Sequence, residues 1–226
     1  MTPLIKQASD HSLLVSFGEG ISVEHHRNVR KLTQLLLSDK PTSVRNLHPG
    51  YNSLLISFDP REVAPENLES DIRSLLGRLG TVALPEERHV EIPVVYGGAS
   101  GPDLHDVASH NRMSGKDVVR IHTSSEYLVY FLGFSPGFPY MGGMSEQIAT
   151  PRLPIPRTSV PAGSVAIAGN QTGIYPVSSP GGWRIIGRTP LRLFDVKLDR
   201  PSLLNMGDLV RFRKITPEEF DRIKEL

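Results

Sequence analysis

The stretch GFSPGFPYMGG, residues 133–143, combines glycine, proline and aromatic side chains without a single charge. It opens a segment, residues 133–187, that holds 10 of the chain's 20 glycines and only four charged residues, Glu146, Arg152, Arg157 and Arg184. From residue 126 onward, short apolar runs alternate with glycine and proline, which predicts strands joined by tight turns in a barrel or sandwich. So few charges are unusual for solvated loops, so we expect a folded surface that shapes a groove or meets a partner.

The predicted β domain spans residues 89–226. A strand is expected at 89–95, then a helix near 103–111 and a second helix after Ser114, whose Asp117 completes a capping-box pattern. Further strands are expected at 165–168, 184–186, 191–194 and 209–212. A charged C-terminal helix should begin at Thr216, with Pro217 in its first position.

Residues 1–88 are predicted to form a separate, small α+β domain. Two short apolar runs at 12–17 and 52–58 indicate strands, and Ser22 is placed to cap a helix between them. A second helix should begin at Pro65, carry one leucine-rich stripe and stop at Gly80. Residues 81–88 (TVALPEER) have the composition of a connector.

Composition excludes several classes of function. The net charge is +1 and the cationic residues are scattered, so nucleic-acid binding is not expected. The absence of cysteine removes disulfides, thiolate nucleophiles and Cys-ligated zinc. The N-terminus lacks a signal-peptide pattern, and the longest apolar run, residues 127–134, is too short to span a bilayer. We therefore expect a cytoplasmic protein without membrane segments.

Gly133-Phe134-Ser135-Pro136-Gly137 has the spacing of a serine-hydrolase elbow. In such an elbow the residue after the serine donates its backbone N–H to the oxyanion hole, and a helix follows. Pro136 has no N–H, and the prolines and glycine that follow the serine disfavour a helix. Ser135 is therefore rejected as a nucleophile.

Nucleotide and metal motifs are missing from the sequence. Gly115-Lys116 is followed by Asp117 and lacks the upstream glycine of a P-loop, and no GxGxxG follows a predicted strand. Any ATP must be held by another chain or by an unusual site. The histidines show no recognised ligand spacing, so no metal site is predicted.

His122 and Glu126 are the last titratable groups before the charge-poor segment. As a pair they could act as a general base and the group that orients it. The alternative is structural, with His122 favouring the negative end of a helix and Glu126 pairing locally.

The arginines of the charge-poor segment suggest anion binding. A guanidinium in a groove with few other polar groups is suited to clamp a carboxylate or phosphate. Arg157 is the first candidate, ahead of Arg152 and Arg184; the alternative is that Arg152 and Arg157 bond loop carbonyls.

Turn residues of the same segment offer amide, hydroxyl and aromatic groups for a small polar ligand or an extended peptide. The alternative is a barrel corner whose core Trp183 fills. The expected lining comprises Gln171, Thr172, Tyr175 and Trp183, with apolar surface from Phe134, Phe138 and Tyr140.

Four long blocks carry a family resemblance: IPVVYGGASGPDL (92–104), SSEYLVYFLGFSPGFPYMGGM (124–144), PAGSVAIAGNQTGIYP (161–176) and SPGGWRIIGRTPLRLFD (179–195). They are similar to the KipI/PxpB family, also called allophanate hydrolase subunit 1. The match covers most of residues 89–213, whereas the N-terminal domain matches in length and pattern only.

The resemblance implies an N-terminal α+β domain and a cyclophilin-like C-terminal barrel. It also implies the B subunit of a 5-oxoprolinase that works with C and A subunits and hydrolyses 5-oxo-L-proline to L-glutamate with ATP cleavage. Two alternatives come from the same family: a binding module that inhibits a sensor histidine kinase, and an accessory domain in urea or allophanate metabolism.

On that basis we hypothesise that Arg157 holds a carboxylate or phosphate, that His122 lies near the attacking water, and that Gln171 bonds the lactam. The isolated chain is expected to be inactive without its partner subunits.

Overall fold

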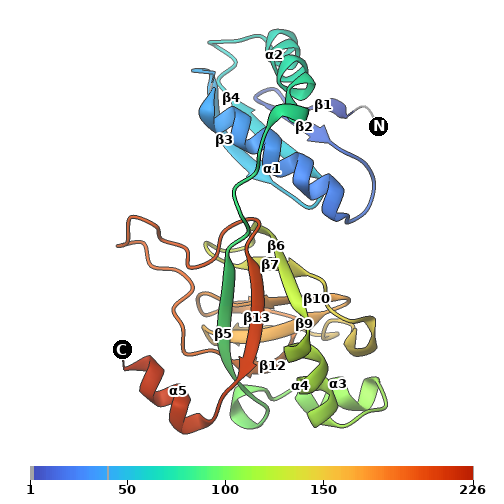
Figure 1. Ribbon diagram of the computed structural model, residues 1–226, viewed down its shortest axis with the longest axis vertical. Coiled ribbons are helices and arrows are strands. Elements are labelled where there is room, and N and C mark those ends of the chain that lie inside the picture. Colours follow the sequence, from blue (N-terminus) through green and yellow to red (C-terminus); the bar gives the residue numbers. More distant parts are fainter. Residues whose placement is uncertain (1–2, 40, 226) are drawn as a thin grey trace. The chain divides into compact units, whose positions relative to one another are not determined.

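The computed structural model describes residues 3–39 and 41–225. The chain divides into two compact units, residues Met1–Glu86 and Glu87–Leu226 (Figure 1). Each unit has its own apolar core, so the two are described separately.

The N-terminal unit contains a four-stranded antiparallel sheet in the order β1-β2-β4-β3. Its strands are β1 (Leu4–Ser9), β2 (Ser12–Ser16), β3 (Val44–Pro49) and β4 (Ser53–Phe58). Side chains alternate along β4, where Leu54, Ile56 and Phe58 are buried and their neighbours are partly exposed. This two-residue period places one face of the sheet in the core. The strands expected at 12–17 and 52–58 are confirmed as β2 and β4.

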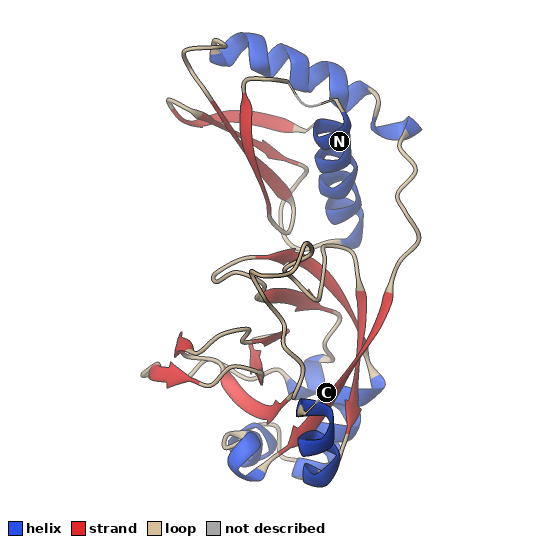
Figure 2. Cartoon of the chain, turned by 90° about the vertical axis from the view of Figure 1, so that its left-hand side faces the viewer, coloured by secondary structure: helices blue, strands red, loops and turns tan. Residues whose placement is uncertain are grey.

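Two helices, α1 (Val23–Ser38) and α2 (Pro65–Gly77), share the apolar core of this sheet (Figure 2). The Ser22 hydroxyl accepts a hydrogen bond from the backbone N–H of His25 at 3.1 Å, so the predicted cap of α1 is confirmed. The predicted stop of α2 at Gly80 is wrong. The helix ends at Gly77, and the Arg78 N–H bonds the carbonyl of Leu75 in a tighter turn before the 3₁₀ segment η1 (Leu79–Thr81).

The C-terminal unit is built on a closed barrel with the strand order β10-β7-β6-β13-β5-β12-β9. Strands β5 and β13 pair in parallel and the other neighbours are antiparallel. A barrel has no free edge, and its closure confirms the predicted barrel. In chain order the strands are β5 (His89–Tyr96), β6 (Glu126–Leu132), β7 (Pro139–Gly142), β9 (Ser164–Ala168), β10 (Gln171–Ile174), β12 (Arg184–Arg188) and β13 (Leu209–Lys214).

Strand β9 is buried at every position because it has packing on both faces. Val165 and Ile167 belong to the core inside the barrel, whereas Ala166 and Ala168 belong to a second cluster that contains Phe138, Tyr175 and Trp183. A separate ribbon of β8 (Arg157–Val160) and β11 (Ser179–Gly181) contributes Val160 to that second cluster. The aromatic residues of the charge-poor segment therefore lie on the outer face of the barrel wall.

Helices α3 (Leu104–His110) and α4 (Gly115–Ser124) pack together beside the barrel (Figure 1). The short 3₁₀ segment η2 (Gly98–Ser100) precedes α3, and η3 (Glu146–Ile148), which follows β7, contacts α4. Ser114 and Asp117 form the expected capping box at the start of α4. Thr216 caps the final helix α5 (Pro217–Lys224), as predicted. Within the described residues, none of the helices has the length and apolarity needed to cross a membrane.

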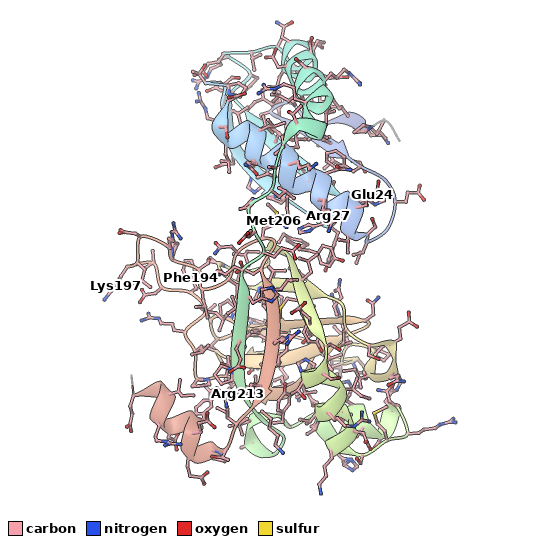
Figure 3. The ribbon with its side chains drawn as sticks, viewed as in Figure 1. Glu24, Arg27, Phe194, Lys197, Met206 and Arg213 are labelled. Carbon is pink, nitrogen blue, oxygen red and sulfur yellow. The ribbon has the colours of Figure 1, made fainter. Side chains whose placement is uncertain are left out.

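The strand expected at 191–194 is wrong. The backbone N–H of Leu191 bonds the Thr189 hydroxyl at 3.2 Å, and only an isolated bridge joins Phe194 to Ser202. Pro190 has no N–H to offer a neighbouring strand. The segment is instead part of the long connection from β12 to β13, on which Phe194 and Lys197 lie (Figure 3).

Candidate functional site

His122 lies on α4 with its side chain inside the barrel core and is fully buried. Its ring packs on those of Tyr127 and Phe212, with centroid separations of 5.2 and 4.5 Å. Nδ1 lies 2.8 Å from the Tyr96 hydroxyl, and Nε2 lies 3.0 Å from the hydroxyl of Thr172. Both ring nitrogens are thus engaged by protein groups.

The partners of His122 fix its tautomer. Thr172 donates its hydroxyl hydrogen to the carbonyl of Ala166 at 3.1 Å, so its oxygen must accept a hydrogen bond from Nε2–H. Nδ1 is then the acceptor for the Tyr96 hydroxyl. Burial lowers the pKa of His122 to about 3, which keeps this imidazole neutral. The geometry favours a structural role for His122, but as a neutral group hydrogen-bonded in the core rather than as a charge at the negative end of a helix.

Glu126 does not lie with His122. It begins β6 and pairs with Arg211 at 3.1 Å and with His89 at 3.3 Å on the exposed surface of the barrel. The structure therefore does not bring the two together as a base and its orienting partner.

Arg157 and Arg184 are both engaged by carboxylates. Arg157 donates to Asp103 Oδ1 at 2.7 Å, and Arg184 pairs with Asp106 at 3.1 Å. The second oxygen of Asp103 accepts the backbone N–H of Ile185 at 2.7 Å, which ties the start of α3 to β12. Arg184 also donates to the carbonyl of Pro151 at 3.2 Å and so anchors the loop that precedes Arg152.

Six of the predicted groove residues line one cavity of about 230 Å³. Its remaining walls are Pro156, Pro180, Gly181 and Gly182. We call it the aromatic cavity; the six predicted residues are Phe134, Phe138, Tyr140, Arg152, Tyr175 and Trp183.

The floor of the aromatic cavity is a set of rings packed edge to face. Phe138 lies 5.5 Å from Trp183 and 5.2 Å from Tyr175 between centroids, with interplanar angles of 88° and 83°. Such perpendicular contacts suit the quadrupoles of aromatic rings. Phe138, Tyr175 and Trp183 are almost completely buried, so the floor is rigidly packed.

Two glycines leave the space that these rings occupy. A Cβ on Gly173 would lie 2.9 Å from Phe138 Cζ and 3.1 Å from the Trp183 ring, and one on Gly181 would lie 2.3 Å from the Tyr175 hydroxyl. The high glycine content of the segment is thus explained in part by close packing against aromatic side chains.

Phe134 lies at the mouth of the aromatic cavity with 65% of its surface exposed. The turn between β6 and β7 is closed by a hydrogen bond from the Gly133 N–H to the Phe138 carbonyl at 3.0 Å. Within it Phe134 has a φ of 68°, an uncommon conformation for a bulky residue that costs roughly 1–3 kcal/mol. Ser135 lies in the same turn, and β7 rather than a helix follows it, as the prolines and glycine after it predict.

Arg152 is the cation of the aromatic cavity. Its guanidinium carbon lies 5.8 Å from the centroid of the Trp183 ring. Burial raises the pKa values of Tyr140 and Tyr175, and the positive charge of Arg152 acts in the opposite direction on both. The electrostatic field of Arg152 therefore reaches both hydroxyl groups of the cavity.

The other predicted residues do not line this cavity. Thr172 and Gly173 are successive residues of β10, so the Thr172 side chain and the Cα hydrogen position of Gly173 that a side chain would take face opposite sides of the barrel wall. Thr172, with His122, is on the inner side, whereas Gly173 faces the aromatic rings. Gln171 begins β10 and does not line the aromatic cavity.

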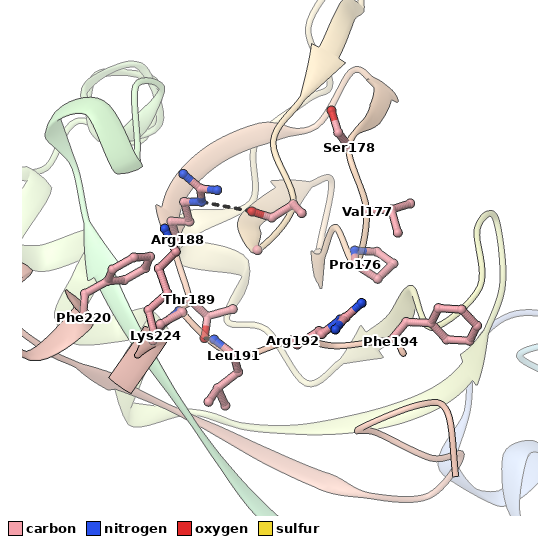
Figure 4. A pocket seen from close by; sticks show the side chains of 13 residues that line it. Pro176, Val177, Ser178, Arg188, Thr189, Leu191, Arg192, Phe194, Phe220 and Lys224 are labelled. Atoms are coloured by element: carbon pink, nitrogen blue, oxygen red, sulfur yellow. Dashed lines mark hydrogen bonds between the residues drawn. The ribbon is translucent and has the colours of Figure 1, made fainter. Parts of the chain in front are cut away.

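A second cavity of about 410 Å³ has cationic walls (Figure 4). Arg188, Arg192 and Lys224 line it without an acidic residue. Arg188, however, donates through Nε to the carbonyl of Ala162 at 3.0 Å, and Arg192 pairs with Asp195 at 2.8 Å. The two guanidinium groups lie apart in Figure 4, so they do not form a single clamp for a phosphate.

The described part of the chain contains no group of three or more His, Asp or Glu side chains arranged to hold a metal ion.

Comparison with known proteins places the chain in a family. The model of the carboxyltransferase domain, subdomain C and D, matches residues 3–204. The chain belongs to this carboxyltransferase-domain family. Among its curated relatives, the 5-oxoprolinase B subunit of Bacillus subtilis (strain 168) is 43% identical, covering 98% of this chain and 96% of the relative. The protein of the same name from Escherichia coli O157:H7 is 48% identical, covering 85% of this chain and 87% of the relative. These matches confirm the family resemblance seen in the sequence.

A solved structure has the same fold over most of this chain. The crystal structure of TTHA0988 superposes with a TM-score of 0.81 at 38% identity and covers 94% of the chain. The chain spans only 40% of the length of TTHA0988.

Sequence reasoning missed Asp103 and Tyr96. Asp103 stands before α3 like a cap, but its side chain makes no cap hydrogen bond and instead holds Arg157 and Ile185. The sequence signal for Asp103 is its place in a stretch of glycine and proline, GGASGPD, beside the predicted barrel. An acidic side chain buried at such a place needs a cation or N–H groups as partners.

Proposed function

We propose that this chain is the B subunit of an ATP-dependent 5-oxoprolinase. In the overall reaction, water cleaves the lactam C–N bond of 5-oxo-L-proline to give L-glutamate, and a second water converts ATP to ADP and phosphate. The observation that carries the proposal is the 39–48% identity, over most of the chain, to three proteins that bear this name.

The geometry supports a chain that contributes binding surface rather than a complete hydrolase site. The buried His122 has both nitrogens engaged, and Ser135 has no elbow around it. Binding of 5-oxo-L-proline requires a cavity that holds the lactam ring and a cation for the carboxylate. The aromatic cavity offers both. We therefore assign this chain part of a composite site or an interface with its partner chains.

We assign ATP binding to another chain of the complex. The sequence has no P-loop or dinucleotide motif, and the two arginines of the second cavity already bond a carbonyl and a carboxylate. The C and A subunits of 5-oxoprolinase are the proposed partners, in the cytoplasm. The cyclophilin-like designation of the barrel is likewise a proposal, supported by the closed strand order.

The sequence predicted chemical roles for His122, Arg157 and Gln171, and the structure supports these roles to different degrees. Arg157 and Gln171 keep their predicted roles as hypotheses. The predicted role of His122 near the attacking water has the weakest support, because the side chain is fully buried inside the barrel.

The test is reconstitution. The chain is mixed with its two proposed partner chains, 5-oxo-L-proline and ATP, and glutamate is measured while each chain is omitted in turn. Glutamate formation that depends on this chain supports the proposal. A mixture of verified, folded chains that forms no glutamate contradicts the proposal. The alternative to test is then inhibition of a sensor histidine kinase, measured by kinase autophosphorylation.

A further inference from the structure

Three arginines occur in the charge-poor segment, and the structure separates them by their partners. Arg157 is 2.7 Å from Asp103, and Arg184 is 3.1 Å from Asp106. Among the residues that the structure describes, no carboxylate lies within ion-pair distance of Arg152. Arg152 is thus the one of the three whose charge is available to an external anion.

The position of Arg152 is defined although its side chain is exposed. The ring of Trp183 holds the guanidinium from one side, and Arg184 anchors the carbonyl of Pro151, the preceding residue. A guanidinium held in this way retains its planar set of N–H donors for a carboxylate.

The size of the aromatic cavity limits its ligand. Pockets for drug-sized molecules measure roughly 300–1,000 Å³, and this one measures about 230 Å³. It is therefore suited to a single small ring rather than to a nucleotide.

The lining limits the chemistry as well. The floor consists of aromatic faces and edges that suit a compact, mostly apolar ring, and the hydroxyls of Tyr140 and Tyr175 supply polar groups. One cation at the rim calls for one negative charge on the ligand. A five-membered lactam that carries a carboxylate has each of these features.

We infer that the aromatic cavity is the subsite in which this chain holds 5-oxoproline, with the ring against Phe138 and Trp183 and the carboxylate on Arg152. This inference rests on the proposed function and locates the substrate's ring and carboxylate on this chain rather than on a partner chain. It assigns the carboxylate to Arg152 rather than to Arg157, whose Nη2 already pairs with Asp103, and leaves phosphate as the anion hypothesised for Arg157.

Phe134 completes the subsite as an exposed wall at its mouth. Its ring lies 5.6 Å from Phe138 and 6.5 Å from Tyr175 between centroids, perpendicular or nearly so to both. The left-handed backbone at Phe134 places this apolar side chain at the entrance although most of its surface is exposed to solvent.

The test uses the full-length chain and its single tryptophan, Trp183, as the probe. Tryptophan fluorescence is titrated with 5-oxo-L-proline, with 2-pyrrolidinone, which lacks the carboxylate, and with an acetylated proline amide as a peptide mimic. Arg152→Gln removes the cation, and Arg200→Gln is the matched control on an exposed loop outside the cavity. Circular dichroism verifies that each variant is folded.

A saturable change is expected with 5-oxo-L-proline. Loss of a charge-assisted hydrogen bond should weaken binding roughly 10- to 100-fold in Arg152→Gln and for 2-pyrrolidinone, and Arg200→Gln should bind like the parent. Three results overturn the inference: no saturable change in the parent chain, equal affinity in Arg152→Gln, or tighter binding of the proline amide than of 5-oxo-L-proline.

Failure here is distinguishable from failure of the proposed function. A reconstituted complex that forms glutamate, together with a parent chain that binds no 5-oxo-L-proline, leaves the proposed function standing and removes this subsite. Binding of 5-oxo-L-proline that depends on Arg152, without glutamate formation in the complex, supports the subsite and contradicts the proposed function.

Discussion

The buried histidine inside the barrel makes the stability of the C-terminal unit depend on pH. His122 has a pKa of about 3 in the folded chain because burial disfavours its charged form, against 6.5 for an exposed histidine. A group whose pKa is lower in the folded state contributes stability that is complete above its unfolded pKa. This contribution is lost as the pH falls from 6.5 toward 3.

Between these limits the unfolded state binds one more proton than the folded state. The His122 contribution then falls by roughly 1.4 kcal/mol for each pH unit, or roughly 2–3 kcal/mol between pH 7 and pH 4.5. His122→Gln is the informative comparison, because its amide can donate toward Thr172 and accept from Tyr96 but does not titrate.

The assay is urea unfolding followed by Trp183 fluorescence, which reports on the C-terminal unit, at several pH values from 7.5 to 4.5. The parent should be more stable than His122→Gln at pH 7.5, and the difference should shrink as the pH falls. A difference that stays constant across this range would refute the assignment of a buried, neutral imidazole.

Three further substitutions test the packing around the aromatic cavity. Asp103→Asn removes the charge that holds Arg157, and urea unfolding should show a loss of roughly 1–3 kcal/mol, since Asp103 is buried; unchanged stability would contradict a stabilising ion pair between Asp103 and Arg157. Gly173→Ala places a methyl group 2.9 Å from Phe138, so it should cost roughly 1–3 kcal/mol and shift the Trp183 emission, whereas an unshifted spectrum would argue against this close packing. Arg184→Gln releases the Pro151 carbonyl and should raise the KM for 5-oxo-L-proline in the reconstituted complex with kcat nearly unchanged; an equal KM would exclude a role in positioning Arg152.

Much of the aromatic cavity was predictable from local sequence. A segment rich in glycine and aromatics with four charges has to cover apolar surface, and that argument alone selected Phe134, Phe138, Tyr140 and Trp183. The capping residues Ser22, Ser114 and Thr216 were predictable for the same reason, because a cap depends only on neighbours within one turn.

The choice among the arginines was not predictable, because it depends on distant partners. Asp103 is 54 residues from Arg157 in the sequence, and Asp106 is 78 residues from Arg184. The surroundings of His122 were not predictable for the same reason, since its partner Thr172 is 50 residues away. The three-dimensional structure was needed to show that His122 lies inside the barrel and that the rings of Phe138, Tyr175 and Trp183 lie on the outer side of its wall.

The central claim is that this chain holds the substrate of a 5-oxoprolinase in its aromatic cavity through Arg152. The most direct measurement is the KM for 5-oxo-L-proline of the reconstituted complex that contains Arg152→Gln, compared with the complex that contains Arg200→Gln. Loss of a carboxylate contact made in both the ground state and the transition state should raise KM roughly tenfold or more and leave kcat nearly unchanged. An active complex whose KM is the same with Arg152→Gln as with Arg200→Gln would contradict the account.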